Sequence, residues 1–156
     1  MRVVLQRVKQ ASVHVDGQLV SSIGPGILAL VGITHDDTPE QMDTLVKRIL
    51  TTKLWPEGAI CQGTAVAAAP EARPWRTSVT ELGGEVLCGT KPDFHMAMGG
   101  EQAQPFYQAF LDKLRSAYAA EKIQDGQFGA MMDVSLVNDV GFMRSSSAID
   151  TAEKRS

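Results

Sequence analysis

The sequence predicts a single domain of mixed α+β class, and three observations lead to that class. The first third of the chain alternates short apolar segments with turn residues, as consecutive β-strands do. Two later segments, 39–50 and 101–118, repeat apolar residues at helical spacing. The length of 156 residues suits one hydrophobic core and is too short for two domains with cores of their own.

The predicted strands begin at the amino terminus. Segments 3–8 and 11–15 each have the composition of a strand. The pair Asp16-Gly17 suits the positive φ angles of a tight hairpin turn, so segment 18–23 should return antiparallel to the strand before it. The unbroken apolar run 27–33 predicts a strand that is covered on both faces, at the centre of the sheet.

The first helix has a clear start. Thr38 can cap it, Pro39 fits the first helical position and Gln41 closes a capping box. One apolar stripe should pack on the sheet, formed by Met42, Leu45, Val46, Ile49 and Leu50. Segment 53–55 predicts a short strand, and the stretch 56–76, rich in Ala, Gly and Pro, predicts a surface excursion.

The second half of the chain is predicted in the same way. Segments 77–82 and 85–88 should form a strand pair around Gly83-Gly84, or one strand with a bend there. The second helix should span 101–118 and bury Ala103, Phe106, Tyr107, Phe110, Leu111, Leu114 and Tyr118. Segment 126–137 has strand character. The domain is therefore expected within 1–143, and 144–156 is expected to be a weakly ordered polar tail.

Composition excludes several classes of protein. With 44% hydrophobic and 21% charged residues, the chain is neither disordered nor typical of a membrane protein. Residues 1–7 do not form a signal peptide, so a cytoplasmic location is expected. The formal charge of −3 argues against a protein that coats nucleic acid, although a small local contact with RNA stays open. Cys61 and Cys88 lack metal-ligand spacing and are expected to be reduced thiols.

Residues that could carry side-chain chemistry are few. Cys88 and His95 could act as a thiol nucleophile and its base, although a cysteine at the end of an apolar strand is more often a core residue. Asp36-Asp37 has no further ligand at metal-binding spacing. His14 and His35 are expected to be solvated. No metal or cofactor is therefore expected.

Segments along most of the chain stand in the order of a known family. They read MRVVLQRV at 1–8, LVGI at 30–33, GGEVLC at 83–88, KPDFHMAM at 91–98, DGQFGAMMDV at 125–134 and SLVND at 135–139. Together they resemble the D-aminoacyl-tRNA deacylase family, also called D-tyrosyl-tRNA deacylases, and the segments 91–98 and 125–134 resemble its eukaryotic type.

The resemblance implies a fold and an activity. The implied fold is an antiparallel-rich sheet packed with two main helices, assembled as a homodimer whose active sites lie at the subunit boundary. The implied reaction is hydrolysis of the ester between a D-amino acid, or glycine, and the 3′-terminal adenosine of tRNA. In that family backbone groups position the substrate and the tRNA 2′-hydroxyl assists, without a metal, a cofactor or a side-chain nucleophile.

The resemblance also implies roles for particular residues. Substrate-binding positions are Phe128, Gly129, Ala130, Phe94 and Ala97. Arg7 and Asn138 are implied to support a loop that excludes L-amino acids from the partner's pocket.

Two family motifs do not stand in this sequence. Gly89 follows Cys88 where a pocket-lining Ser-Gln-Phe-Thr is expected, and Val140 follows Asp139 where a Gly-Pro motif is expected. Catalytic residues therefore stay unassigned. Two alternatives also stay open. One is an inactive homologue that binds the tRNA 3′ end or serves as a structural dimer, and the other is a thiol hydrolase that uses Cys88 and His95.

Overall fold

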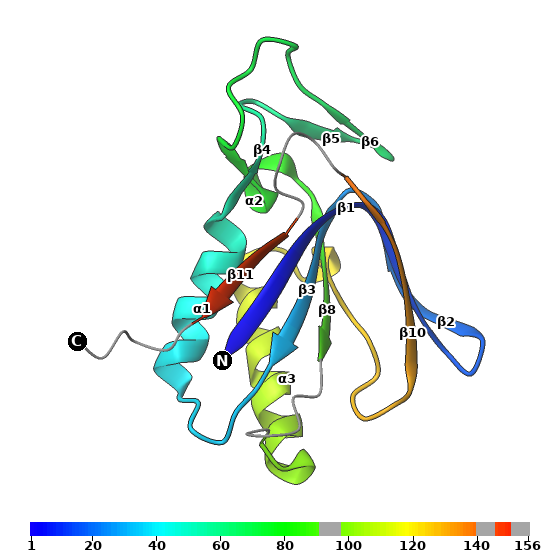
Figure 1. Ribbon diagram of the computed structural model, residues 1–156, viewed down its shortest axis with the longest axis vertical. Helices are drawn as coiled ribbons and strands as arrows, with labels where there is room; N and C mark the ends of the chain where they lie inside the picture. The colour runs from blue at the N-terminus through cyan, green and yellow to red at the C-terminus, as the bar shows by residue number, and fades with distance from the viewer. Residues whose placement is uncertain (91–97, 140–145, 151–156) are drawn as a thin grey trace.

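The computed structural model describes residues 1–90, 98–139 and 146–150, and it confirms the mixed α+β class (Figure 1). The helices are α1 (Pro39–Thr51), α2 (Val79–Leu82), α3 (Gly100–Ala117) and the 3-10 helix η1 (Ala120–Lys122). The strands are β1 (Arg2–Val15), β2 (Gln18–Ile23), β3 (Gly26–Gly32), β4 (Lys53–Trp55), β5 (Ile60–Gln62), β6 (Ala65–Ala67), β7 (Thr77–Ser78), β8 (Glu85–Thr90), β9 (Ile123–Asp125), β10 (Met132–Asn138) and β11 (Ser146–Asp150).

Strand β1 connects the two halves of the main sheet. The sequence predicted two strands at 3–8 and 11–15, but the structure joins them into one strand of 14 residues with a register irregularity between Val8 and Gln10. The first half of β1 pairs with β3 and β11, and the second half pairs with β2 and β10. A register irregularity of this kind bends a strand, and Figure 1 shows β1 arching so that the sheet curls on itself.

The predicted hairpin and central strand are both confirmed. Asp16 and Gly17 have φ angles of 50° and 76°, and β2 returns antiparallel to β1. The path through the sheet is β10-β1-β3-β8-β9, which puts β3 at the centre. All four pairings of β1 are antiparallel, whereas β3–β8 and β8–β9 are parallel, so the sheet is mixed.

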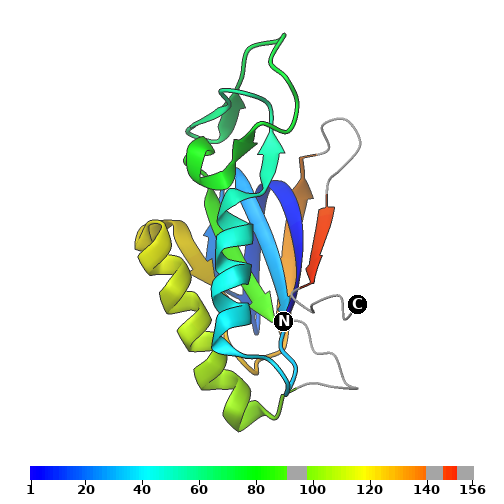
Figure 2. The ribbon, with the colours of Figure 1, turned by 90° about the vertical axis from the view of Figure 1, so that its left-hand side faces the viewer.

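Two hydrophobic cores cover the two faces of the central strand. Helices α1 and α3 lie side by side on one face of the sheet (Figure 2), where they pack on residues such as Leu5, Ile27 and Val31. The curled sheet covers the other face itself, with a second core formed by Val8, Ala11, Val13, Ile23, Leu28 and Leu87. Each core removes apolar surface from water, so burying β3 on both sides favours the observed bend.

Both long helices match their predictions. The structure shows the Thr38 capping box with Gln41, Pro39 in the first turn, and burial of the whole predicted stripe of α1. In α3 the buried residues are Ala103, Tyr107, Phe110, Leu111 and Leu114, while Phe106 and Tyr118 are partly buried.

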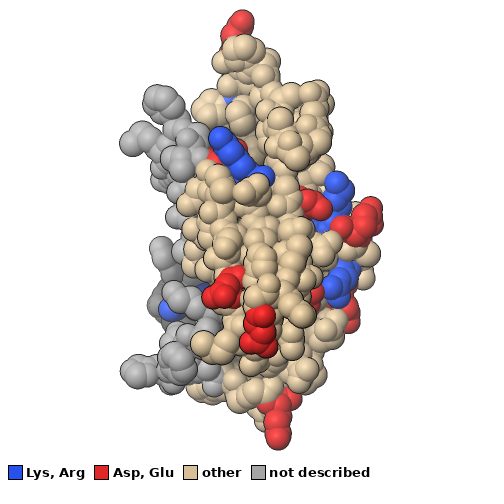
Figure 3. All heavy atoms as spheres, turned by 90° about the vertical axis from the view of Figure 1, so that its right-hand side faces the viewer, with Lys and Arg blue, Asp and Glu red and all other residues tan. Residues whose placement is uncertain are grey.

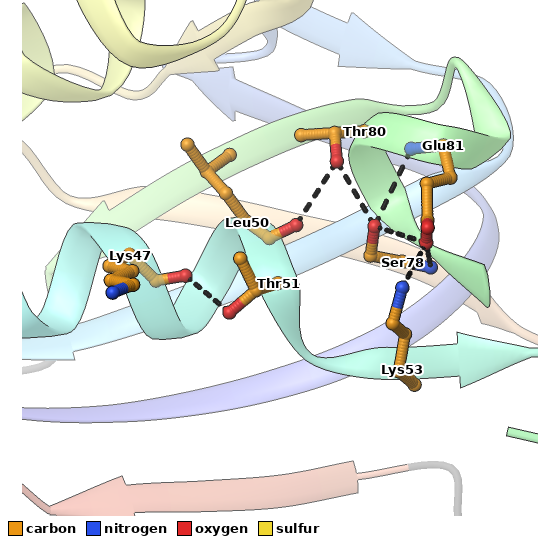
Figure 4. Close-up of polar contacts among 7 residues, drawn as sticks. All are labelled: Lys47, Leu50, Thr51, Lys53, Ser78, Thr80 and Glu81. Carbon is orange, nitrogen blue, oxygen red and sulfur yellow. Dashed lines mark hydrogen bonds and ion pairs between the residues drawn. The ribbon is translucent and has the colours of Figure 1, made fainter. Parts of the chain in front are cut away.

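The predicted strand pair around Gly83-Gly84 is wrong in its first half. Only Thr77 and Ser78 form a strand, and α2 follows at once. The Ser78 hydroxyl accepts from the Glu81 N–H, while the Glu81 carboxylate accepts from the Ser78 N–H at 2.7 Å and from Lys53 (Figure 4). This capping box starts a helix, and Gly83 at φ 72° ends it.

Two further segments differ from expectation. Within the predicted tail, residues 146–150 form β11, which pairs with the first half of β1. Backbone pairing satisfies an otherwise open strand edge whatever the side chains are, so a polar segment can form the edge strand.

Strand β10 begins only at Met132, because 128–129 form a turn. The excursion 56–76 contains the β5–β6 hairpin. The helices among the described residues are too short or too polar to span a bilayer.

Candidate functional site

Arg7 lies at a junction of three elements. Its side chain is nearly buried, with the residue 8% exposed. Nε donates to Asp139 Oδ2 at 2.9 Å and Nη1 donates to the Leu54 carbonyl at 2.6 Å. The guanidinium carbon lies 5.8 Å from the centroid of the Trp55 ring. Asn138 pairs with Val8 in the β1–β10 register, so the two predicted support residues stand on neighbouring strands.

Asp139 is the partner that the sequence did not reveal. Its N–H donates to the Arg7 carbonyl at 3.0 Å, so backbone and side chain both tie it to Arg7. The two residues are 132 positions apart, and only the antiparallel register of β1 and β10 brings them together. The one available signal was an acidic residue two positions after the last predicted strand.

Residues 127–130 form a turn, called the Phe128 turn below, which carries three of the predicted substrate-binding residues. Gly129 has a φ of 76°, a left-handed conformation that favours glycine, and it is exposed. The Ala130 N–H donates to the Gln127 carbonyl at 3.2 Å and closes the turn. Phe128 is half-buried and packs on the main core through Tyr107, with ring centroids 5.8 Å apart.

The end of β8 anchors this turn. The Gly126 N–H donates to the Cys88 carbonyl at 3.2 Å. A side chain at Gly126 would have its Cβ 2.5 Å from the Met132 sulfur, so glycine allows this close packing. The family resemblance implies a substrate pocket beside the end of β8 and beside the Phe128 turn. Phe94, Ala97 and His95 lie outside the described residues.

The two groups of predicted residues lie at opposite ends of β10. The Phe128 turn precedes Met132, whereas Asn138 and Asp139 close the strand at its far end (Figure 1). Seven residues of antiparallel strand extend over about 20 Å. One chain therefore does not bring Arg7 and the Phe128 turn into a single site.

The environment of Cys88 opposes a thiol mechanism. Its side chain is fully buried, and burial raises the pKa of the thiol to about 12. The reactive form of cysteine is the thiolate, which this environment suppresses at neutral pH. Burial also raises the pKa of Cys61, and both cysteines are free thiols. In the described part of the chain no three His, Cys, Asp or Glu side chains gather as metal ligands do.

A groove of about 1040 Å³ crosses the surface formed by β1, β2 and β10. Its polar lining includes Ser12, His14, Ser22 and Ser135. Exposed apolar side chains adjoin these groups, with Leu19 59% and Val137 45% exposed. Lys9 and Glu85 also line the groove, and Figure 3 shows acidic and basic side chains scattered over a side of the molecule that is otherwise uncharged. Sequence reasoning missed the groove because strand pairing, and not sequence proximity, assembles it.

Comparison with known proteins supports the resemblance. Residues 4–143 match the model of the D-Tyr-tRNA(Tyr) deacylase family. A D-aminoacyl-tRNA deacylase from Yarrowia lipolytica is 41% identical over 152 residues, covering 89% of this chain and 92% of the relative. One from Drosophila melanogaster is 44% identical over 150 residues, covering 89% and 87%.

Solved structures share the fold. One described as "c-Myc DNA Unwinding Element Binding Protein" is 35% identical with a TM-score of 0.83, covering 98% of this chain and all (100%) of that chain. Another, described as "a probable eukaryotic D-amino acid tRNA deacylase", has a TM-score of 0.70 at 17% identity, over 95% of this chain and 98% of the other. The family match and the curated relatives together extend over nearly the whole sequence. This chain belongs to the D-Tyr-tRNA(Tyr) deacylase family.

Proposed function

We propose that this protein hydrolyses the ester bond between a D-amino acid, or glycine, and the 3′-terminal adenosine of a mischarged tRNA. The observation that carries the proposal is the match to relatives named D-aminoacyl-tRNA deacylase, which are above 40% identical over 89% of this chain. The reaction is proposed to take place in the cytoplasm and without a cofactor.

The proposed chemistry relies on positioning rather than on a side-chain nucleophile. The exposed backbone at Gly129 has no side chain above it, so a nucleoside can approach the peptide groups of the turn closely. Donors fixed before the reaction stabilise the negative charge that develops on the ester oxygen. The tRNA 2′-hydroxyl would assist the attack. Phe94 and Ala97 are proposed to complete the pocket with the Phe128 turn.

We also propose that the active form is a homodimer. Arg7 and Asn138 lie at one end of β10, while the Phe128 turn lies about 20 Å away at the other end. In a dimer with a two-fold axis across β10, the Asn138 end of β10 in one copy would lie near the Phe128 turn of the other. The reason is that an isologous interface joins the same patch on both subunits. The exposed apolar side chains of Leu19 and Val137 beside the groove favour this contact, because an interface would remove them from water.

An inactive homologue is the second candidate function. The observation that favours it is the absence of the two family motifs, since Gly89 follows Cys88 and Val140 follows Asp139. Such a protein would still bind the aminoacylated 3′ end without cleaving it. DNA binding, the activity in the description of one structural relative, finds less support in a chain with a formal charge of −3.

One experiment separates these functions. The intact mass of the protein is first checked against the 16.8 kDa of this sequence, so that the assay concerns this chain. Matched D- and L-tyrosyl-tRNA are then incubated with it. Cleavage of the D-ester alone is expected. Retention of both esters, with tight binding of a non-hydrolysable D-tyrosyl-adenosine amide, would favour the inactive homologue. If the protein neither cleaves nor binds, both proposals are wrong.

The oligomeric state is measured on the same sample. Multi-angle light scattering at micromolar concentration should give twice the mass of the chain. A monomer that cleaves the D-ester would contradict the shared site, because each pocket is proposed to need residues from the other copy.

A further inference from the structure

Three aromatic rings connect helix α3 to the Phe128 turn. Tyr107 stacks on Phe110 with ring centroids 6.2 Å apart and an interplanar angle of 26°. Tyr107 also meets Phe128, with ring centroids 5.8 Å apart and an interplanar angle of 35°. Phe110 is fully buried and Tyr107 is 4% exposed, so the core fixes both rings. Phe128 is the outermost of the three and is only half-buried.

This contact is a major restraint on the turn. On one side the Gly126 N–H holds the turn to the Cys88 carbonyl, and within it a single hydrogen bond joins Ala130 to Gln127. Gly129 is exposed. Packing of Phe128 on Tyr107 adds a side-chain contact between the turn and the buried face of α3. Aromatic pairs at this separation stabilise a defined geometry beyond the area they bury.

We propose that Tyr107 is a positioning residue for substrate binding. Its ring fixes the Phe128 ring, and through it the backbone of Gly129 and Ala130, in the conformation that receives the adenosine or the aminoacyl group. Tyr107 itself does not touch the substrate. The proposal rests on the proposed function, since it assumes that the Phe128 turn contacts the substrate. The ring makes the contact, so phenylalanine at position 107 should preserve it.

The test measures binding of a non-hydrolysable D-tyrosyl-adenosine amide by calorimetry, together with KM and kcat for D-tyrosyl-tRNA. Tyr107→Leu should weaken binding and raise KM by about threefold to tenfold, the range of one aromatic pair. Tyr107→Phe should restore both values to within about twofold of wild type. Leu114→Ala is the matched control, because Leu114 is fully buried in the same helix. It should lower the melting temperature without changing the Kd.

A double-mutant cycle distinguishes positioning from loss of stability. If Tyr107 acts through Phe128, adding Tyr107→Leu to Phe128→Leu should cause no further loss of affinity. Additive losses would overturn the inference. So would wild-type affinity in folded Tyr107→Leu; if that variant does not fold, Tyr107→Met replaces it in the comparison.

Failure of the proposed function gives a different result. Phe128→Leu would then bind the amide as tightly as wild type, or wild type itself would not bind it. Weakened binding in Phe128→Leu with unchanged binding in Tyr107→Leu overturns the positioning role alone.

Discussion

Replacing Arg7 by methionine tests how the end of β10 is held in place. The change removes two hydrogen bonds from a charged donor, at 2.9 Å to Asp139 and 2.6 Å to the Leu54 carbonyl. Such bonds contribute about 1.5 kcal/mol or more each. The stacking on Trp55 adds about 0.5 kcal/mol. Methionine fills most of the apolar volume, so the expected loss of unfolding free energy is about 3 kcal/mol.

Urea unfolding measures this loss directly, since the free energy of unfolding falls linearly with denaturant. For a domain of this size the melting temperature should also fall, by about 3 °C per kcal/mol. Arg7→Lys is the control and should lose less, because it keeps the charge but not the forked geometry. A loss below about 1 kcal/mol for Arg7→Met would refute the view that this junction holds β10. The loss should also be non-additive with Asp139→Asn, since the two side chains share one bond.

Three further predictions concern packing, pH and the thiol. Gly26→Ala should strongly lower the urea midpoint, because its Cβ would lie 1.9 Å from a backbone oxygen of β8; Gly24→Ala, with its nearest atom at 3.7 Å, should be nearly neutral, and equal midpoints would refute this. The Lys53 hydrogen bond lowers the pKa of Glu81 from 4.5 to about 2. The ionised Glu81 carboxylate therefore stabilises the folded state fully above pH 4.5, and this contribution disappears as the pH falls toward 2. The difference in unfolding free energy between wild type and Glu81→Gln should shrink over that range, and a constant difference would contradict it. Cys88→Ala should keep D-ester cleavage, because burial raises the pKa of the Cys88 thiol to about 12. Loss of cleavage in folded Cys88→Ala would instead support the thiol mechanism.

Elements with local signals were predicted correctly. The capping box at Thr38, the stripe of α1 and the Asp16-Gly17 turn all depend on residues within one or two turns of chain. The same kind of signal exists for α2, where Ser78 and Glu81 form a capping box, but the segment is short and rich in β-forming residues, and this composition predicts a strand. Strand β11 had no local signal, because its partners are the backbone groups of β1.

The candidate site divides in the same way. Likeness to a family predicts Arg7, Asn138 and the Phe128 turn as site residues from short motifs, and their roles stay predictions. It did not reveal that Asp139 is the partner of Arg7, or that Tyr107 supports Phe128, because these contacts join distant parts of the chain. Phe94 and Ala97 stay predictions as well, and they lie outside the described residues.

The sequence by itself determined the class of the fold, the two long helices, the central strand and the family. These follow from periodicity and motifs that act over a few residues. The tertiary structure alone decided the bend of β1, the pairing of β11, and the separation of the two site regions along β10. The physical reason is that strand register and core packing join residues more than a hundred positions apart, and no local pattern encodes which distant backbone groups will meet.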